Sequence, residues 1–244
     1  MGDCRLGGQN WNSLFHIAMK KKLIVLTGAG VSAESGIQTF RDGDGLWENH
    51  RIEHVATPEA WNNDPELVLE FYNMRRKQVI QAQPNEAHRL LADLQKTFEV
   101  FIITQNIDDL HERAGSKRVL HLHGEILKKR CTIQHDCIAS AEETMTLTTT
   151  SSGGHWRPHI VWFGEQVPML EEAILLAEQA DIFLVIGTSL LVYPAASLIQ
   201  FAPKNAETWI IDPKIPAHLP ATFNTIAKPA TIGMREYVDR LNAL

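Results

Sequence analysis

The chain has 244 residues, of which 44% are hydrophobic and 21% are charged, and its formal net charge is −6 at pH 7. This composition supports a packed core and excludes a disordered chain, and the negative balance gives no basic field that would hold nucleic acid. No apolar run reaches the length of a membrane span, and three cysteines are too few for a disulfide framework, so we expect a cytoplasmic protein without nucleic-acid or membrane partners.

Apolar runs typical of strands alternate with helical patterns along the chain. The expected strands are Leu23–Thr27, Glu99–Thr104, Val119–Leu122, Asp181–Ile186 and Thr208–Ile211. The expected helices are Pro65–Gln81, Asn85–Lys96, Leu170–Gln179 and Pro194–Phe201. This alternation predicts an α/β fold, with a Rossmann-like parallel sheet that carries helices on both faces.

Two regions interrupt the alternation. Residues 41–84 contain no strong strand pattern, and residues 126–160 are polar and irregular. We interpret both as insertions that together form a smaller lobe, and a cleft between two lobes is a natural ligand site. The sheet domain then comprises residues 19–40, 85–125 and 161–244. Residues 1–18 precede Met19 and a run of lysines, which suggests a loose leader or a start assigned too early.

The first expected strand runs into a glycine-rich loop, residues 28–36 (GAGVSAESG). Gly28, Gly30 and Ala33 have the G-x-G-x-x-G/A spacing of a dinucleotide-binding turn. In such a turn, glycines let the chain approach a pyrophosphate, and the next helix offers free backbone amides. The alternative is a tight strand–helix turn that binds nothing.

The segment after this loop argues against a dehydrogenase. A dehydrogenase needs an acidic residue at the end of the next strand, about 20 residues on, to hold the adenine ribose. The sequence instead has a glycine-rich loop with a basic residue, Phe40–Trp47, which is typical of a loop that covers a cofactor.

Two further strands end in polar residues. Gln105, Asn106 and Asp108 follow the second expected strand, and residues 187–189 (GTS) follow the fourth. Because ligands of open parallel sheets bind at the carboxyl ends of the strands, we expect these side chains to orient a nucleotide. Helix capping is the alternative for Asn106 or Asp108 taken singly.

His121 and His123 lie at the end of the short third strand. A histidine suits a general base because its unperturbed pKa lies near working pH. The alternative is a hydrogen-bonded structural histidine. Residues two apart on a strand share a face, so spacing alone does not separate these two.

Five motifs stand in order along the chain: residues 28–41 (GAGVSAESGIQTFR), 104–108 (TQNID), 121–124 (HLHG), 163–165 (FGE) and 187–189 (GTS). Together they resemble the sirtuin family of NAD-dependent protein deacylases. The resemblance implies a large NAD-binding domain and a small lobe with a helical module and a zinc module. It also implies that the acyl-lysine carbonyl oxygen attacks the ribose carbon that holds nicotinamide. A histidine base then activates a ribose hydroxyl, and the products are lysine, nicotinamide and O-acyl-ADP-ribose.

The resemblance also implies roles for individual residues. His123 would be the base, and Asn106 and Asp108 would assist it. The implied NAD-binding residues are Gly28, Ala29, Gly30, Glu34, Thr39, Phe40, Arg41, Trp47, Gln105, Asn106, Ile107, Asp108, Gly187, Thr188, Ser189, Asp212 and Ala230. Two segments would sandwich the substrate peptide by strand addition. Their implied contact residues are Val161, Phe163, Gly164, Glu165, Val192 and Tyr193.

The helix expected over Pro65–Gln81 carries the signal for the acyl group. At about 100° per residue, Val68, Tyr72, Arg75 and Val79 fall in one stripe. An arginine in an apolar stripe needs an anionic partner, unless it pairs with an internal acid or extends its head to water. Tyr72-x-x-Arg75 resembles the pair that marks sirtuins preferring succinyl-, malonyl- or glutaryl-lysine, the class III bacterial type. We therefore expect removal of acidic acyl groups together with acetyl.

The zinc module departs from the family pattern of two Cys-x-x-Cys pairs. Cys131 stands at the first ligand position, but Gln134 stands at the next, and Thr149 and Ser152 stand at the second pair. A non-standard zinc set is an alternative, and its members would be Cys131, His135, Cys137 and His155. We expect no metal and a degenerate zinc-ribbon module.

Two other functions remain as alternatives. One is a module that binds NAD or ADP-ribose without turnover, and the intact His123 and Asn106 argue against it. The other is mono-ADP-ribosyl transfer from the same pocket, which the sequence leaves open.

Overall fold

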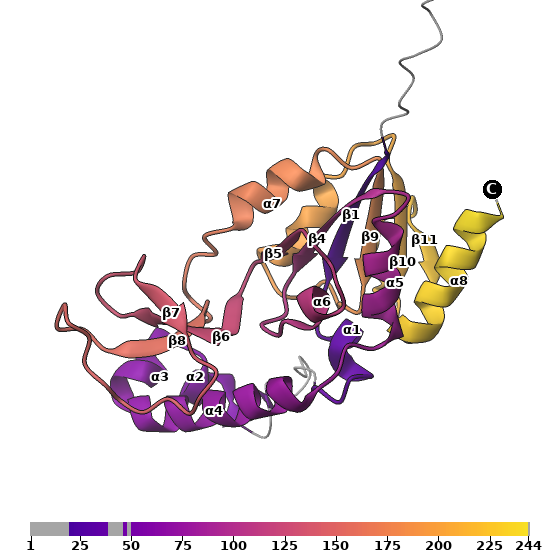
Figure 1. The fold of residues 1–244 in the computed structure, drawn as a ribbon. Coiled ribbons are helices and arrows are strands. Elements are labelled where there is room, and N and C mark those ends of the chain that lie inside the picture. Colours follow the sequence, from indigo (N-terminus) through magenta and orange to yellow (C-terminus); the bar gives the residue numbers. More distant parts are fainter. Residues whose placement is uncertain (1–19, 39–45, 48–49, 244) are drawn as a thin grey trace, which may run out of the picture.

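The computed structural model describes residues 20–38, 46–47 and 50–243. Its main feature is a six-stranded sheet in the order β11-β10-β9-β1-β4-β5, in which all neighbours are parallel (Figure 1). The strands are β1 (Lys22–Thr27), β4 (Glu99–Thr104), β5 (Val119–His121), β9 (Ile182–Ile186), β10 (Glu207–Ile211) and β11 (Asn224–Ile226). The Rossmann-like parallel sheet predicted from the sequence is confirmed.

Helices cover both faces of this sheet (Figure 1). On one face, α5 (Glu86–Leu94) and α8 (Ala230–Asn242) pack over a core that includes Leu23 and Val25 of β1. On the other face, α7 (Leu170–Ala177) and the 3-10 helix η2 (Ala195–Gln200) pack over Ile24 and Leu26. Successive β1 residues thus enter opposite cores, which explains the continuous apolar run.

The strand order reverses at the centre of the sheet. From β1 the chain builds β4 and β5 on one side, and later builds β9, β10 and β11 on the other side. The carboxyl ends of β1 and β9 are therefore neighbours at the switch point, with Thr27 paired with Ile186. Ligands of doubly wound sheets bind at this position.

The remaining elements form a smaller lobe beside the sheet edge (Figure 1). Its helices are α2 (Ile52–Val55), α3 (Pro58–Asn63) and α4 (Pro65–Gln81), and its antiparallel sheet, in the order β7-β6-β8, contains β6 (Gly124–Cys131), β7 (Ile138–Ser140) and β8 (Trp156–Ile160). The short helices α1 (Gly30–Ala33) and α6 (Leu110–Arg113) and the strand pair β2 (Leu46–Trp47) and β3 (His50–Arg51) complete the described elements.

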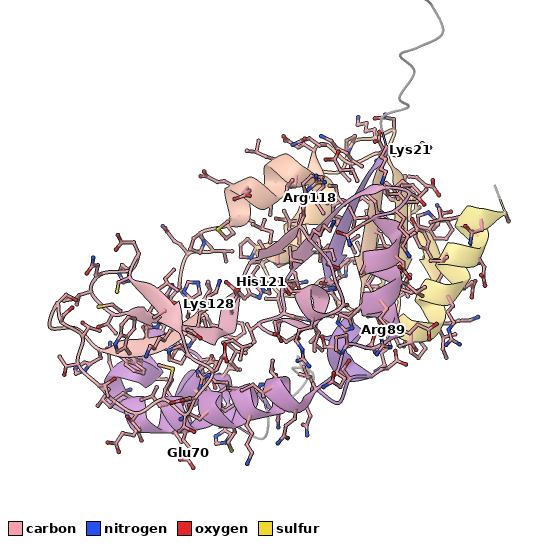
Figure 2. The ribbon with its side chains drawn as sticks, viewed as in Figure 1. Lys21, Glu70, Arg89, Arg118, His121 and Lys128 are labelled. Carbon is pink, nitrogen blue, oxygen red and sulfur yellow. The ribbon has the colours of Figure 1, made fainter. Side chains whose placement is uncertain are left out.

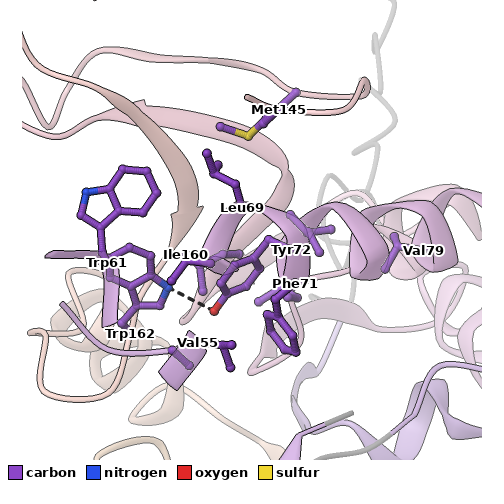
Figure 3. Packing of buried hydrophobic residues seen from close by; sticks show 14 of the residues in the cluster. Val55, Trp61, Leu69, Phe71, Tyr72, Val79, Met145, Ile160 and Trp162 are labelled. Carbon is purple, nitrogen blue, oxygen red and sulfur yellow. Dashed lines mark hydrogen bonds between the residues drawn. The ribbon is translucent and has the colours of Figure 1, made fainter. Parts of the chain in front are cut away.

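The small lobe has a hydrophobic core of its own, which includes Trp61, Phe71, Tyr72, Ile160 and Trp162 (Figure 3). The exact lobe boundaries, 41–84 and 126–160, stay a prediction.

Several elements differ from the sequence expectations. Residues 126–160, whose sequence pattern showed no clear strands, hold the antiparallel sheet, and its short strands are partly exposed and carry many polar residues. The helix expected over Pro194–Phe201 is a 3-10 helix. Strand β11 and helix α8 were not expected, since β11 has only three residues and Gly233 weakens the helical pattern of α8.

Within the described part of the chain, no helix combines the length and apolar character needed to cross a membrane.

Candidate active site

A cavity of about 370 Å³ lies at the carboxyl edge of the parallel sheet, where the sheet meets the small lobe. Its wall combines the loops after β1, β4 and β9 with residues from α4 and from the segment after β8. The lining includes most of the residues that the sequence singled out, namely Gly28, Ala29, Gly30, Tyr72, Arg75, Gln105, Asn106, Ile107, Asp108, His123, Val161, Phe163, Gly164, Glu165, Gly187, Thr188, Ser189, Val192, Tyr193 and Asp212. Tertiary structure thus brings the predicted cofactor, catalytic and acyl-binding residues to one cavity.

Two predicted NAD-binding residues do not line this cavity. Both carboxylate oxygens of Glu34 are occupied by Thr231, one by its backbone N–H at 2.9 Å and one by its hydroxyl at 2.7 Å. Ala230 is the buried first residue of α8. The structure therefore gives Glu34 a capping contact at the start of α8 rather than a place in the cavity wall. Thr39, Phe40 and Arg41 lie outside the described residues, as does the side chain of Trp47.

The glycine-rich loop is held against the turn that follows β9. A Cβ atom on Gly28 would lie 2.6 Å from Thr188 Cβ, and one on Gly30 would lie 2.7 Å from Gly187 Cα. Gly187 has a φ of +63°, a conformation that side-chain-bearing residues rarely adopt. These glycines are therefore required for contact between the two loops. Because α1 has only four residues, the helix-dipole argument for this motif is weaker than the spacing suggested.

A buried serine that no sequence motif singled out joins the polar residues at the end of β4. The Ser32 hydroxyl donates to Asp108 Oδ2 and accepts from Asn106 Nδ2, each at 3.0 Å. His88 Nε2 lies 3.5 Å from the same oxygen, and burial lowers the pKa of His88 to about 4. Burial raises the pKa of Asp108, although the backbone N–H of Leu110 and the Ser32 hydroxyl stabilise its carboxylate. The only signal for Ser32 in the sequence was its place in the glycine-rich loop.

The structure separates His123 from His121, which spacing did not. His123 Nδ1 lies 3.0 Å from the backbone oxygen of Gln105, so this nitrogen carries the hydrogen and Nε2 is left as the basic atom. Burial holds the pKa of His123 below its ordinary value, although the bond to Gln105 acts in the opposite direction. His123 is therefore neutral at neutral pH and lines the cavity.

His121 has partners at both ring nitrogens. Its Nδ1 lies 3.1 Å from the Asn106 backbone oxygen, and its Nε2 lies 2.8 Å from a Glu112 carboxylate oxygen. Burial acts to lower the pKa of His121, but the Glu112 carboxylate more than offsets it and the pKa is raised. Figure 2 shows His121 where the parallel sheet meets the small lobe, and the residue is absent from the cavity wall. His121 is thus held by hydrogen bonds at both ring nitrogens, outside the cavity wall.

The stripe predicted on α4 is buried. Val68, Tyr72 and Val79 are at most 1% exposed and Arg75 is 4% exposed, so the idea that Arg75 extends its head to water is wrong. Arg75 Nη1 lies 3.5 Å from the Gln38 backbone oxygen. Both Tyr72 and Arg75 line the cavity that contains His123. A cation and a phenol therefore lie on the small-lobe side of the same space.

Glu165, predicted to contact the substrate peptide, is engaged by other residues of the chain. Arg157 binds both of its carboxylate oxygens, at 2.6 and 3.1 Å, and Arg130 Nη2 lies at 3.0 and 3.1 Å from the same pair. The backbone N–H of Trp162 donates to Oε2 at 2.8 Å. Burial acts to raise the pKa of Glu165, but these donors hold it below its ordinary value. This carboxylate organises the wall of the cavity.

The degenerate zinc module does not offer a tetrahedral donor set. The Cys131 Sγ atom lies 3.3 Å from the Thr150 hydroxyl and 3.4 Å from the Ser152 hydroxyl. Among the residues that the structure describes, no three His, Cys, Asp or Glu side chains are grouped so as to hold a metal ion. The alternative set of Cys131, His135, Cys137 and His155 is therefore not assembled, and these residues do not fit zinc.

We expect Cys131→Ser to retain the fold and the activity, because a hydroxyl can replace the thiol beside Thr150 and Ser152. Loss of a true zinc ligand would instead unfold the module. Elemental analysis of the purified protein should find far less than one zinc per chain, and EDTA should leave the melting temperature unchanged. Near-stoichiometric zinc, or unfolding by EDTA, would contradict this expectation.

Comparison with known proteins identifies similar chains over nearly the whole length. A model described as the Sir2 family matches residues 28–194. An NAD-dependent protein deacylase of Helicobacter pylori is 51% identical over 223 residues, which cover 91% of this chain and 97% of that protein. A second one, from Aggregatibacter actinomycetemcomitans, is 55% identical over 196 residues, covering 80% and 94% of the two chains. A solved complex of a Sir2 homolog with NAD has 41% identity and a TM-score of 0.82, covering 92% and 90%.

Proposed function

The chain belongs to the Sir2 family and is an NAD-dependent protein deacylase, and from this premise we propose that it removes succinyl and malonyl groups, together with acetyl groups, from protein lysines. The observation that carries the proposal is that Tyr72 and Arg75 line the same cavity as His123. A buried guanidinium in the wall of such a cavity favours a ligand with a carboxylate, because its fork can bind both carboxylate oxygens.

The residues around the glycine-rich loop fit NAD. Gly28 and Gly30 let this loop pack against the turn after β9, and the loop lines the same cavity as the polar ends of β4 and β9. We propose that this loop holds the pyrophosphate, and that Asn106, Asp108 and Ser189 orient the nicotinamide ribose. When bound, NAD supplies a ribose carbon from which nicotinamide departs. Asp212 lines the cavity and suits a ribose hydroxyl as an acceptor.

His123 suits the role of general base in this cavity. Its Nδ1 is committed to the Gln105 backbone oxygen, which fixes the ring and leaves Nε2 to accept a proton from a ribose hydroxyl. The lowered pKa keeps this nitrogen unprotonated at neutral pH. Ser32 holds Asn106 and Asp108 in place beside it.

We propose that the substrate peptide lies between residues 161–165 and 191–193. Phe163, Leu191 and Tyr193 are 40%, 56% and 68% exposed, which is unusual for large apolar side chains. Phe163 and Tyr193 also line the cavity mouth. Backbone pairing in such a cleft would give affinity with little demand on peptide sequence.

The test is a set of peptides that are identical except for the group on one lysine. The groups are succinyl, malonyl, glutaryl, acetyl, none, and 4-methylpentanoyl, which has nearly the shape of succinyl but no charge. We expect kcat/KM for succinyl to exceed that for 4-methylpentanoyl by about tenfold or more, since charge-assisted bonds to Arg75 are lost in the neutral analogue.

Mass spectrometry of the products distinguishes the alternatives. Nicotinamide release together with O-acyl-ADP-ribose, only with acylated peptide, is the expected result. Equal rates for succinyl and 4-methylpentanoyl would refute the acidic preference. ADP-ribose attached to the unmodified peptide would support mono-ADP-ribosyl transfer, and NAD binding without turnover would support a binding module.

A further inference from the structure

A buried hydrogen bond joins the acyl-binding helix to the segment after β8. The indole Nε1 of Trp162 lies 3.1 Å from the hydroxyl oxygen of Tyr72, and the bond is drawn as a dashed line in Figure 3. The two side chains are 2% and 0% exposed. An indole N–H can only donate, so Tyr72 accepts in this bond.

This bond constrains the hydrogen of the Tyr72 hydroxyl. A phenol hydroxyl can donate one hydrogen bond and can also accept one. The Tyr72 oxygen accepts from the Trp162 indole, so the hydroxyl hydrogen must point away from the indole. Burial raises the pKa of Tyr72 above its ordinary value, so the phenol keeps its hydrogen throughout the physiological range. Tyr72 is therefore a neutral phenol whose hydrogen is directed away from Trp162, and the residue is part of the cavity wall.

Trp162 is itself held from two sides. The guanidinium carbon of Arg157 lies 3.2 Å from the centroid of the Trp162 ring, which is a close cation–π contact. The backbone N–H of Trp162 donates to Glu165 Oε2, and Glu165 binds Arg157 through both carboxylate oxygens. Arg157 also donates to the Ile160 backbone oxygen at 2.9 Å. The main chain and the ring face of Trp162 are thus clamped by one ion pair.

This arrangement has a consequence for an acyl carboxylate. An ionised carboxylate only accepts hydrogen bonds, and it gains most from donors that are oriented before it binds. Arg75 supplies donors on the same helix, one turn from Tyr72. A Tyr72 hydroxyl whose hydrogen is already turned from Trp162 loses little freedom when it donates to such a ligand. An acetyl group has no carboxylate at that position and gains nothing from this orientation.

We propose that Trp162, clamped by Arg157 and Glu165, is a positioning residue that sets the Tyr72 hydroxyl as a donor to the acyl carboxylate. This inference rests on the proposed preference for acidic acyl groups and deepens it.

The test is Trp162→Phe, which keeps an aromatic ring in the core and removes the N–H. We expect the ratio of the KM for succinyl-lysine peptide to the KM for acetyl-lysine peptide to rise about tenfold, the effect of one hydrogen bond to a charged ligand, with little change in kcat for either substrate. In a Tyr72→Phe background, the same substitution should leave the ratio unchanged, because the hydroxyl it positions is absent.

Trp61→Phe is the matched control. Trp61 packs beside Trp162 in the same core, with ring centroids 5.8 Å apart, but it does not line the cavity. We expect it to leave the KM ratio as in the unmodified protein. Replacing residue 162 with β-(3-benzothienyl)alanine, which has the shape of tryptophan without the N–H, gives the same readout if Trp162→Phe fails to fold.

The outcomes separate this inference from the proposed function. If the unmodified protein prefers succinyl-lysine but neither replacement at position 162 raises the KM ratio, the positioning role is wrong and the proposed function stands. A fall in kcat that is equal for both substrates would also overturn it, since that result indicates a structural role. If the unmodified protein has no acidic preference, both proposals fail.

Discussion

Replacing His123 with alanine should lower kcat/KM for every acyl-lysine substrate by roughly 10²- to 10⁴-fold, the usual contribution of a positioned general base. His123 lines the cavity, and its ring is fixed by the bond from Nδ1 to the Gln105 backbone oxygen, so alanine removes the proton acceptor at Nε2. Steady-state rates with succinyl- and acetyl-lysine peptides measure the loss. Circular dichroism and NAD binding should stay close to those of the unmodified protein.

His121→Gln is the control for this prediction. His121 lies two residues away on the same strand end, has partners at both ring nitrogens and is absent from the cavity wall. We expect this variant to lose some stability and to keep its kcat. Equal losses of activity in the two variants would contradict the assignment of His123 as the base.

The two histidines should also differ in their pH dependence. Burial lowers the pKa of His123. As the pH is lowered, kcat/KM should therefore begin to fall only at a pH below about 6.5, the ordinary pKa of histidine. The pKa of His121 is raised in the folded protein, because the Glu112 carboxylate outweighs the effect of burial. The protonated His121 side chain therefore stabilises the fold fully at pH values below its pKa in the unfolded chain. This stabilisation is lost as the pH rises through its pKa in the folded protein. His121→Gln should therefore lower the free energy of unfolding more in acid than in alkali, and should leave the acid limb of the rate in place.

Replacing Arg75 with methionine should lower kcat/KM for succinyl-lysine by roughly 10²-fold and leave that for acetyl-lysine within a few-fold. Arg75 is 4% exposed and lines the cavity, so its loss leaves an acyl carboxylate buried without its cation. Methionine retains much of the side-chain volume, and we expect the variant to fold. Rates on matched succinyl- and acetyl-lysine peptides measure the change in selectivity.

Arg76→Met is the matched control, one residue along the same helix. Arg76 is also buried, but it donates to the Ile126 backbone oxygen, to Asn73 Oδ1 and to Met145 Sδ, away from the cavity. Burial lowers its pKa to about 10. We expect this variant to lower the melting temperature and to change both activities by the same factor. If Arg75→Met also lowers both activities equally, Arg75 does not select the acyl group.

Features that depend on neighbours along the chain were predictable. The α4 helix spans Pro65–Gln81 as expected, because Asp64 caps its first turn and Pro65 suits its first position. Asn85 was expected to start a helix, and its side chain accepts from the backbone N–H of Ala87. Strand β4 keeps its predicted bounds because an uninterrupted apolar run is buried from both faces of a parallel sheet.

Functional groups at the ends of strands were also predictable, but their partners were not. The carboxyl ends of parallel strands meet at one edge, so Gln105, Asn106 and Thr188 had to lie close together. Ser32 was missed because its role depends on side chains 74 and 76 positions away. Glu34 and Glu165 were predicted to contact ligands, and nothing in the sequence indicated that Thr231 and Arg157 bind their carboxylates in the structure.

By itself, the sequence determined the fold class, the family and the set of residues from which the cavity is built, because periodicity and motif spacing are local properties. Tertiary structure alone decided which partners the two histidines have, since Glu112 bonds to His121 and the Gln105 backbone oxygen bonds to His123. It also decided that Trp162 donates to Tyr72 across 90 positions of sequence. A hydrogen bond requires two atoms at the right distance and angle, and only the packing of distant segments sets both.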